Sequence, residues 1–579
     1  MRDAIGIDFG TTNSLCAWMD GDRPTLLNNR RGVRLTPSVV AVSAKGEVLV
    51  GESAKNQALV NPENTIGAIK GRLGAERLLQ MGGRNWRAEE LASMVLASLR
   101  QDAESVLGVE IRRAVITVPA NFSERERRGV VEAGALAGLE VLRLVNEPTA
   151  AAVARAWSLS GMPAGPQKTS LVLVYDFGGG TFDVTLLEQE GSECRVLASR
   201  GDGHLGGADI DRELYVLAAA DFLARYGTDV EADRFLAQQL VQAAEHSKIE
   251  LSVREESVIG IPFALSGGAE GGKIVHPQRA ITRAELERIA APYVERSLGL
   301  TEAVLRDAGV SAGEIGSLVL SGGMSRMPMI RRLLGERLGL SPDGAVNPEE
   351  IVALGAAVWT SLLEGSARIR VRDVVSRSYG IEIDGDGFVP LIAKNSPVPA
   401  SKSRVFTTVS DRQDSVEIHI LQGESASAAE NLSLGRFLLS GIREARKGEP
   451  RIRVDFRIDE SDLLRVSAVD LDSGAQQAIS IADIGRGASS EPPEQLLGKI
   501  RVLVDRVSEL RAGINLERSL DAELDEVIAR AGAAPSSAIG GEAGLRLLKV
   551  ELEALVGELL ARRDERRVRD LRSGPESGR

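Results

Sequence analysis

Two glycine-rich turns in the first third of the chain have the composition of phosphate-binding loops. The first follows Asp8 in the run Asp-Phe-Gly-Thr-Thr-Asn, and the second follows Asp176 in the run Asp-Phe-Gly-Gly-Gly-Thr-Phe-Asp. Glycine permits positive φ and a close approach of the backbone, so N–H groups and threonine hydroxyls in such turns can contact phosphate oxygens. One such turn alone would be an ordinary tight turn. Two copies about 168 residues apart predict two halves of a duplicated fold that hold a triphosphate from opposite sides.

Each of these turns comes directly after a strand-like segment that ends in an aspartate. Asp8 and Asp176 are therefore expected beside the phosphate groups, at the ends of their strands. Magnesium prefers a few carboxylates together with water and phosphate oxygens. We predict that Asp8 and Asp176 hold Mg²⁺ through water.

Other candidate phosphate-binding and metal-binding motifs lack residues or elements that such sites need. Residues 267–273 nearly match the P-loop pattern, but Ile274 stands where serine or threonine is needed. The segment also joins two strand-like runs instead of opening a helix, so we interpret it as a hairpin loop. Asp-Phe-Gly occurs in protein kinases as well, yet the chain has no His-Arg-Asp catalytic loop. Metal-ligand spacing is absent among the histidines, which we interpret as surface or packing residues: His204, His246, His276 and His419.

A third glycine turn, at Gly322 and Gly323, also follows a strand-like segment. Glu245, Lys248 and Ser252 lie at a spacing that places them on one face of a helix. Together the turn and the helix face could cradle a nucleoside. Taken alone, the helix face is equally well explained as a solvated charged surface.

The elements that must position these residues follow from the apolar pattern. Residues 1–365 alternate short apolar segments with longer segments of helical period, which is typical of an α/β domain. Strands are expected at Ala4–Asp8, Ala114–Val118, Leu171–Asp176 and Ser317–Leu320, and helices at Ala88–Leu107, Glu124–Ala137 and Asp211–Ala224.

The pattern changes near residue 380 to a period of two, which predicts a half-exposed antiparallel β-sandwich. Beyond residue 487, apolar residues recur at helical spacing, which predicts a short helical domain. The predicted organisation is an α/β domain at 1–365, a linker at 366–378, a β-sandwich at 379–487 and a helical domain at 488–579. Sandwich strands are expected at Arg404–Val409, Val416–Leu421, Arg451–Ile458, Leu464–Val469 and Ala478–Ile481.

Composition excludes several classes of protein. A chain of 579 residues is too long for one hydrophobic core. Its net charge of −12 and aromatic content of 3% argue against nucleic-acid binding. Cys16 and Cys194 form no CxxC pair, which argues against a disulfide-framed secreted fold. With no apolar leader and no run of 18 apolar residues, we expect a cytoplasmic protein that does not contact the membrane.

Several long motifs resemble, in their order along the chain, those of the seventy-kilodalton heat-shock chaperones of DnaK type. The resemblance covers about residues 1–485. It implies a multidomain protein with an actin-like ATPase domain (a duplicated ribonuclease-H-like fold), then an antiparallel β-sandwich, then a short α-helical lid. Besides the two Asp-Phe-Gly turns, the motifs are Asn146-Glu-Pro-Thr-Ala-Ala-Ala, His204-Leu-Gly-Gly-Ala-Asp, Ser321-Gly-Gly-Met-Ser-Arg-Met-Pro and Leu421-Gln-Gly-Glu.

The resemblance also implies roles for individual residues. The cofactors would be ATP or ADP and Mg²⁺, with K⁺ as a further candidate ion, and Lys70 would reach the transferring phosphate. The implied catalytic residues are Asp8, Lys70, Glu147, Asp176 and Thr181. The implied nucleotide contacts are Gly10, Thr11, Thr12, Asn13, Gly178, Gly179, Gly180, Gly206, Gly207, Glu245, Lys248, Ser252, Gly322, Gly323 and Arg326. Peptide would bind at Ile381, Asp384, Phe406, Val409, Val416 and Ile418, and Pro119, Arg127 and Arg143 match positions that relay nucleotide state or meet J-domain co-chaperones.

The mechanism that this resemblance implies couples two sites. ATP binding would dock the β-sandwich and open its peptide groove, and hydrolysis would reverse both changes, because each state binds peptide differently. The implied partners are unfolded or extended polypeptides, a J-domain co-chaperone and a nucleotide exchange factor.

Three departures from the family pattern bear on this mechanism. The linker Ile369–Asp373 has two apolar residues where the family has a leucine-rich run, so we expect it to dock less well in an apolar groove. Asp384 stands where an arch residue over the groove is usually apolar, and Val409 where it is usually small. About 90 residues follow Gly485, and we expect them to form a shortened lid.

These departures leave three functions to separate. The first is an ATP-dependent chaperone that binds and releases unfolded polypeptide segments under control of ATP hydrolysis. The second is a regulatory or client-specific binding protein that retains the ATPase, as the altered arch and linker suggest. The third is a small-molecule kinase of the actin superfamily, which the predicted sandwich at 379–487 disfavours.

Overall fold

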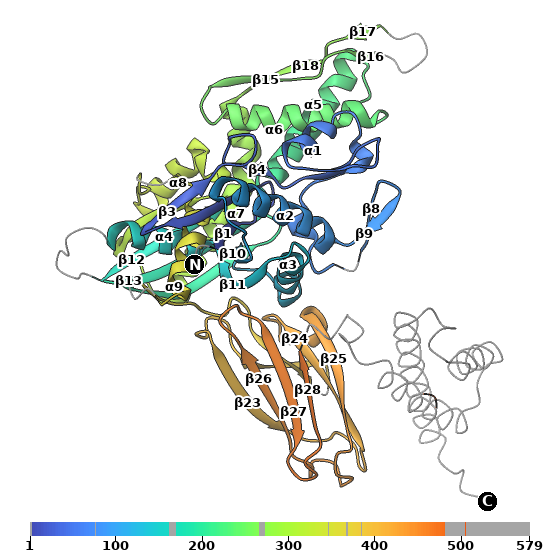
Figure 1. Ribbon diagram of the computed structural model, residues 1–579, viewed down its shortest axis with the longest axis vertical. Coiled ribbons are helices and arrows are strands. Elements are labelled where there is room, and N and C mark those ends of the chain that lie inside the picture. The colour runs from blue at the N-terminus through green and yellow to red at the C-terminus, as the bar shows by residue number, and fades with distance from the viewer. Residues whose placement is uncertain are drawn as a thin grey trace, which may run out of the picture. The chain divides into compact units, whose positions relative to one another are not determined.

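The computed structural model describes residues 3–75, 77–160, 169–265, 273–344, 347–365, 369–383, 385–480 and residue 504 (Figure 1). Two compact units make up the chain, one of residues 1–434 and 438–477 and the other of 435–437 and 478–579. The first unit contains the predicted α/β domain, the linker and most of the β-sandwich. The predicted helical domain, with the exception of Val504, lies outside the described residues.

A mixed sheet begins the α/β part, in the strand order β11-β10-β1-β2-β3. Strand β1 pairs antiparallel with β2 and parallel with β10, so the turn after Asp8 is the turn of a hairpin. The strands are β1 (Ala4–Asp8), β2 (Asn13–Asp20), β3 (Arg23–Leu27), β10 (Arg113–Val118) and β11 (Glu140–Asn146), with β4 (Thr36–Pro37) beside β2.

A second mixed sheet repeats this plan in the order β19-β12-β13-β14-β20. Its strand β12 pairs antiparallel with β13 and parallel with β19, so Asp176 also precedes a hairpin turn. The prediction of two matched strand-turn units is therefore confirmed. The strands are β12 (Ser170–Phe177), β13 (Phe182–Glu190), β14 (Glu193–Asp202), β19 (Ile315–Ser321) and β20 (Arg370–Arg372).

Helices α4 (Glu147–Ser160) and α9 (Ile351–Leu363) pack against each other and against these sheets. Small residues bring the elements close. A Cβ on Gly6 of β1 would lie 2.1 Å from the backbone nitrogen of Ala357, and one on Gly355 would lie 1.9 Å from the carbonyl oxygen of Ala150. Both positions therefore require glycine, which lets α9 pack closely on β1 and on α4.

The remaining helices and small sheets surround these layers (Figure 1). Helices α5 and α6 lie beside the small β15–β18 pair, and α2 packs on α3. The helices are α1 (Glu52–Gln57), α2 (Ala88–Leu107), α3 (Glu124–Leu136), α5 (Gly207–Tyr226), α6 (Arg234–Glu250), α7 (Arg283–Ala308) and α8 (Pro328–Leu338). The short strands are β5 (Val40–Val42), β6 (Val48–Val50), β7 (Thr65–Ile66), β8 (Leu79–Met81), β9 (Arg84–Trp86), β15 (Glu256–Gly260), β16 (Ala264–Leu265), β17 (Ile274–Val275) and β18 (Gln278–Thr282).

Two four-stranded sheets form the β-sandwich, in the orders β22-β21-β24-β25 and β23-β26-β27-β28. Alternating side chains of these strands are buried, among them Ile420, Phe456 and Val466, as the period of two predicts. The strands are β21 (Tyr379–Ile383), β22 (Gly387–Ile392), β23 (Ala400–Phe406), β24 (Ser415–Gln422), β25 (Leu432–Ser440), β26 (Ile452–Ile458), β27 (Leu464–Asp470) and β28 (Gln476–Ser480).

Element boundaries differ from the sequence predictions in a few places. Helix α5 begins at Gly207, four residues before the predicted start, because the carboxylate of Asp209 accepts the Gly206 N–H at 2.8 Å and caps the helix. Strand β23 ends at Phe406, since the Val409 N–H is bound by the Gln413 side chain in a turn. Residues 266–272 lie outside the described residues, but the flanking strands β16 and β17 pair antiparallel, as a hairpin requires.

The linker differs from its prediction in a more important way. Its residues Arg370–Arg372 form strand β20, which pairs parallel with the edge strand β14. Ile369 is buried, and Arg372 pairs with Glu193 at 2.8 Å. The linker therefore lies at a sheet edge and pairs with it through its backbone, and how strongly it docks stays a prediction.

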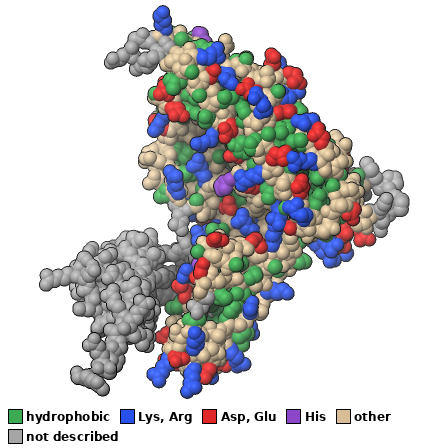
Figure 2. All heavy atoms as spheres, turned by 180° about the vertical axis from the view of Figure 1, so that it is seen from behind, with side chains coloured by type: hydrophobic (Ala, Val, Ile, Leu, Met, Phe, Trp, Pro, Cys, Tyr) green, Lys and Arg blue, Asp and Glu red, His purple; other side chains and the backbone are tan. Residues whose placement is uncertain are grey.

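Two further features concern the surface. Positive and negative side chains are interspersed over the face drawn in Figure 2. In the described part of the chain, no helix is both long and apolar enough to cross a membrane.

Candidate functional site

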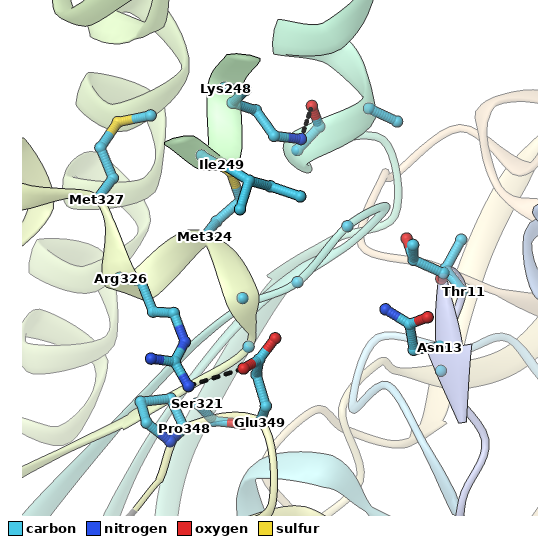
Figure 3. Close-up of a pocket in the computed structure, with 18 of the residues that line it drawn as sticks. Thr11, Asn13, Lys248, Ile249, Ser321, Met324, Arg326, Met327, Pro348 and Glu349 are labelled. Atoms are coloured by element: carbon cyan, nitrogen blue, oxygen red, sulfur yellow. Dashed lines mark hydrogen bonds and ion pairs between the residues drawn. The ribbon is translucent and has the colours of Figure 1, made fainter. Parts of the chain in front are cut away.

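A cavity of about 880 Å³ opens between the two hairpin turns and the third glycine turn. Figure 3 shows Thr11 and Asn13 on one side of it and Ile249, Met324 and Arg326 on the other. All the predicted catalytic residues line it: Asp8, Lys70, Glu147, Asp176 and Thr181. Of the predicted nucleotide contacts, those that line it are Gly10, Thr11, Thr12, Asn13, Gly178, Gly179, Gly207, Glu245, Lys248, Ser252, Gly322, Gly323 and Arg326.

Gly180 and Gly206 are not among the lining residues, but they support the turns. The two hairpin turns touch, since a Cβ on Gly179 would lie 2.1 Å from the hydroxyl oxygen of Thr12. A Cβ on Gly206 would lie 2.5 Å from the backbone of Gly179. The glycines thus let two turns from distant parts of the chain approach the same space.

Lys70 lies at the floor of the cavity, in a short 3-10 helix (Ile69–Arg72), and is 1% exposed. Its ammonium group forms an ion pair with the carboxylate of Glu147, the first residue of α4. The hydroxyl of Thr117 donates to Asp8 at 3.1 Å. One ammonium group therefore stands among several buried carboxylates.

The pKa values of the buried carboxyl groups near this cavity are raised. Burial, and after it the charge of Glu147, raises the pKa of Asp8 to about 7. The same two causes raise the pKa of Asp176 and of Asp183 well above the usual range for a carboxyl group. Asp183, which accepts the Asn121 N–H at 3.2 Å, was missed by the sequence analysis although it belongs to the second Asp-Phe-Gly motif.

A bound cation would neutralise the buried carboxyl groups that line this cavity. Within the described residues, no cluster of three His, Cys, Asp or Glu side chains has metal-ligating spacing. The carboxyl oxygens of Asp8 and Asp176 line the cavity and are of the type that Mg²⁺ takes as ligands, together with water and phosphate oxygens.

The opposite wall of the cavity carries both charged and apolar side chains. Lys248 donates to Asp211 at 2.6 Å and to the carbonyl oxygen of Gly207 at 3.0 Å, and Glu245 pairs with Lys55 at 3.0 Å. Arg326 pairs with Glu349 at 2.7 Å, as the dashed line in Figure 3 shows.

The sequence analysis placed Ser252 on the helix, but α6 ends at Glu250 and Ser252 lies in the turn beyond it. It also missed further lining residues, namely Asp211, Ile249, Met324 and Glu349. Among them Met324 belongs to the quoted motif at 321–328, and Asp211 carried a signal as an acid near the His204–Asp209 motif that could pair with Lys248.

Comparison with known proteins decides the family. The sequence model described as Hsp70 protein matches residues 4–78 and 76–502. The chain is 43% identical over 493 residues to the chaperone proteins DnaK of Thermotoga neapolitana, Thermotoga petrophila and Thermotoga maritima, which covers 84% of this chain and 81% of each relative. The chain belongs to the Hsp70 family. This Hsp70 protein is an ATP-dependent molecular chaperone with ATPase activity.

The predicted peptide-binding residues of this Hsp70 protein lie on the β-sandwich. Ile381 of β21 and Ile418 of β24 are buried in neighbouring strands of one sheet, while Phe406 ends β23 in the other. Val416 is half-buried and Val409 is 50% exposed. Asp384 lies outside the described residues, so its position relative to these side chains stays a prediction.

The linker and the sandwich of this Hsp70 protein contact the α/β part through a buried polar network. Asp373 accepts hydrogen bonds from Asn146 at 3.1 Å and from Thr149 at 3.0 Å, at the start of α4 beside Glu147. From the sandwich, the Leu464 N–H donates to Glu124 at 3.1 Å. The network thus connects β27 and the linker to the helix that carries a catalytic candidate.

Arg127, one of the predicted relay residues, is at the centre of this network. It is fully buried, donates to Asn146 at 2.7 Å and lies 3.4 Å from the carboxylate of Asp462. Burial raises the pKa of both Glu124 and Asp462 to about 7, although Arg128 and Arg127, respectively, act against it. Arg143, a second relay candidate, stacks on Trp359 with 4.4 Å between its guanidinium carbon and the ring centroid.

Proposed function

We propose that the large cavity binds ATP and ADP, with the triphosphate between the two hairpin turns and the adenosine against α6 and the third glycine turn. The observation that carries this proposal is the meeting of both Asp-Phe-Gly turns with Lys70 in one cavity. The proposal assumes an actin-like fold, in which each of the two mixed sheets belongs to one half of a duplicated fold. The corresponding domain boundaries are 1–365, 366–378, 379–487 and 488–579.

Asp8 and Asp176 would hold Mg²⁺ through water, and Asp183 would add to the negative field. The ion, when bound, offsets the negative charge of the phosphate oxygens. Because the pKa values of these buried carboxyls are raised, a bound cation would also keep them ionised at neutral pH. The family implies K⁺ as a further ion, for which we assign no residues.

Lys70 and Glu147 would divide the work of hydrolysis. Lys70 would offset the charge that spreads over the transferred phosphoryl group, and Glu147 with Thr181 would orient the attacking water. The ion pair between Lys70 and Glu147 supports these two roles, since it holds both side chains beside the same part of the cavity. The hairpin turns would hold the phosphates in place while this occurs.

The β-sandwich would bind unfolded or extended polypeptide segments at Ile381, Phe406, Val416 and Ile418. Nucleotide state would reach it through the linker and the network of Asp373, Glu124 and Arg127. The family further implies a J-domain co-chaperone and a nucleotide exchange factor as partners, and a cytoplasmic location.

Peptide release on nucleotide exchange tests this proposal. A fluorescent peptide bound in the presence of MgADP should dissociate faster when MgATP is added, because the two states differ in peptide affinity. The control is MgADP added a second time. Equal dissociation rates with both nucleotides would contradict the coupling of the cavity to the sandwich.

The alternative of a client-specific protein rests on Asp384. An unpaired carboxylate over the groove would disfavour purely apolar segments and attract basic ones. Asp384→Met should therefore raise the affinity for leucine-rich peptides and lower it for lysine-rich ones. Unchanged affinities for both peptides would mean that Asp384 is not on the groove.

A further inference from the structure

A second cavity, of about 610 Å³, lies within the same compact unit where the α/β part meets the sandwich. Its volume falls in the range of roughly 300–1,000 Å³ that is typical of small-molecule sites. Residues of the α/β part, the linker and the sandwich all contribute to its wall. Its polar and charged lining consists of Asn121, Ser199, Arg200, Ser376, Arg377, Lys394, Gln422, Glu424, Ser425, Glu430 and Asn431.

Two amide side chains on this wall are buried without a full set of hydrogen-bond partners. Asn121 is 7% exposed, and neither its Nδ2 nor its Oδ1 atom has a partner. Gln422 is 1% exposed; its Oε1 accepts the Glu124 N–H at 3.3 Å, but its Nε2 has no partner. Because a buried polar group without a hydrogen-bond partner destabilises the fold, a polar occupant of the cavity would stabilise both side chains.

The cations on the wall are also poorly neutralised. Lys394 lies 3.9 Å from Asp307, whose two carboxylate oxygens are already bound by Arg200 at 2.7 and 2.9 Å. Arg377 has no ion-pair or side-chain hydrogen-bond partner among the described residues. Burial, and after it the nearby charge of Arg200, lowers the pKa of Lys394. Two of the three cations on the wall, Arg200 and Lys394, thus share the one close carboxylate of Asp307, and Glu424 adds a more distant negative charge.

The two carboxylates on the wall are hydrogen-bonded to serine groups and form no close ion pair with Arg377 or Lys394 among the described residues. Glu424 accepts the N–H of Ser378 at 2.7 Å and its hydroxyl at 2.9 Å, one at each carboxylate oxygen. Glu430 accepts the hydroxyl of Ser425. The side-chain groups without a full set of partners are mainly hydrogen-bond donors, namely those of Asn121, Gln422, Arg377 and Lys394. An occupant rich in hydrogen-bond acceptors therefore satisfies them better than water alone.

We propose that this cavity is a binding site for a small organic molecule with two anionic groups of phosphate or carboxylate type. Arg377 and Lys394 bind the anionic groups, and the amides of Asn121 and Gln422 donate to the remaining acceptors. Because the α/β part, the linker and the sandwich each supply part of the site, the bound anion stabilises the arrangement in which they are in contact. The site is separate from the large cavity, so its occupancy does not depend on the assignment of the ATP site.

Equilibrium dialysis of labelled probes against the full chain tests this proposal. The probes are fructose 1,6-bisphosphate for the phosphate type and succinate for the carboxylate type, with the large cavity saturated first by MgATP and then by MgADP. We expect saturable binding of one probe with at least one nucleotide. The probe that binds identifies the type of anion.

Three variants locate the binding. Arg377→Gln and Lys394→Gln should each weaken it at least about tenfold, which is the loss of roughly 1.4 kcal/mol. Gln422→Glu keeps the acceptor for the Glu124 N–H, replaces the free donor with a negative charge and should abolish binding. Arg446→Gln, an exposed arginine of the sandwich outside the cavity, is the matched control and should leave the affinity unchanged.

Retained MgADP binding and an unchanged unfolding temperature show that each variant is folded. If Arg377→Gln or Lys394→Gln fails this check, the isosteric Gln422→Glu decides alone. The proposal is overturned if neither probe binds saturably with either nucleotide. It is also overturned if the folded variants bind as tightly as the wild type.

Discussion

At the scale of single residues, the proposed ATP cavity is an arrangement of opposing charges. Asp8, Asp176 and Asp183 are buried with raised pKa values, and Lys70 is the ammonium group that stands among them and Glu147. A bound cation would neutralise these carboxyl groups, and the Lys70 ammonium group would attract the oxygens of a transferring phosphoryl group.

Substitution of Lys70 tests this arrangement. Lys70→Ala should lower the ATP turnover number by about 10²–10³-fold, because it removes the preorganised charge beside the phosphoryl group. ATP binding, measured by calorimetry, should be largely retained, since the turns still hold the phosphates. Lys45→Ala, in an exposed loop, is the control. Normal turnover in Lys70→Ala would contradict the role of Lys70 in phosphoryl transfer.

A second residue-scale feature is the buried carboxyl of Asp462 beside Arg127. Its pKa is about 7 in the folded chain against an ordinary value near 4, so the folded chain holds a proton between these pH values that the unfolded chain releases. The stability that this raised pKa contributes is therefore fully present below about pH 4, and it is lost as the pH rises through about 7.

Asp462→Asn removes this titration. The midpoint of urea unfolding of the variant should rise relative to wild type between pH 6 and pH 8, because only the wild type acquires a buried charge in that window. Asp472→Asn is the control, since Arg451 lowers the pKa of Asp472 and holds it ionised at both pH values. A constant difference between Asp462→Asn and wild type would show that Asp462 is solvated in solution.

At the scale of elements, the sequence patterns predicted what depends on neighbours in the chain. Strand β1 and helix α2 begin and end where the patterns placed them, since apolar period, turn residues and caps are local signals. The meeting of the two Asp-Phe-Gly turns could also be predicted, because both carry the same strand-turn motif. Asp211 could not be placed, since its partner Lys248 lies on another helix. The pairing of the linker with β14 could not be predicted for a related reason, as it depends on a strand edge that is distant in the sequence.

Two helical glycines provide a matched prediction at this scale. Gly355→Ala should destabilise the protein by about 1–3 kcal/mol or more, because the new Cβ would overlap the Ala150 carbonyl where α9 crosses α4. Gly299→Ala, on the exposed face of α7 with no atom within 4 Å of the new Cβ, should stabilise it by about 0.5–1 kcal/mol. The free energies of unfolding of both variants can be compared by urea titration. Equal effects would mean that α9 does not pack on α4 as described.

At the scale of the whole molecule, the proposed coupling between the nucleotide and peptide sites would depend on Asp373. It accepts hydrogen bonds from Asn146 and Thr149, which flank Glu147, and it follows directly on strand β20. A change in the sandwich can therefore reach the start of α4 through the linker. No comparable side-chain contact of Asp373 with the large cavity is found among the described residues, so its loss should affect coupling more than chemistry.

The measurement that tests the account most directly is peptide stimulation of ATP turnover in the wild type and in Asp373→Ala. The account predicts that an unrelated extended peptide raises the turnover of the wild type, and that Asp373→Ala loses most of this increase while it still hydrolyses ATP without peptide. Equal stimulation in both proteins would contradict the linker network as the route of coupling, and no stimulation of the wild type by any peptide would contradict the coupling itself.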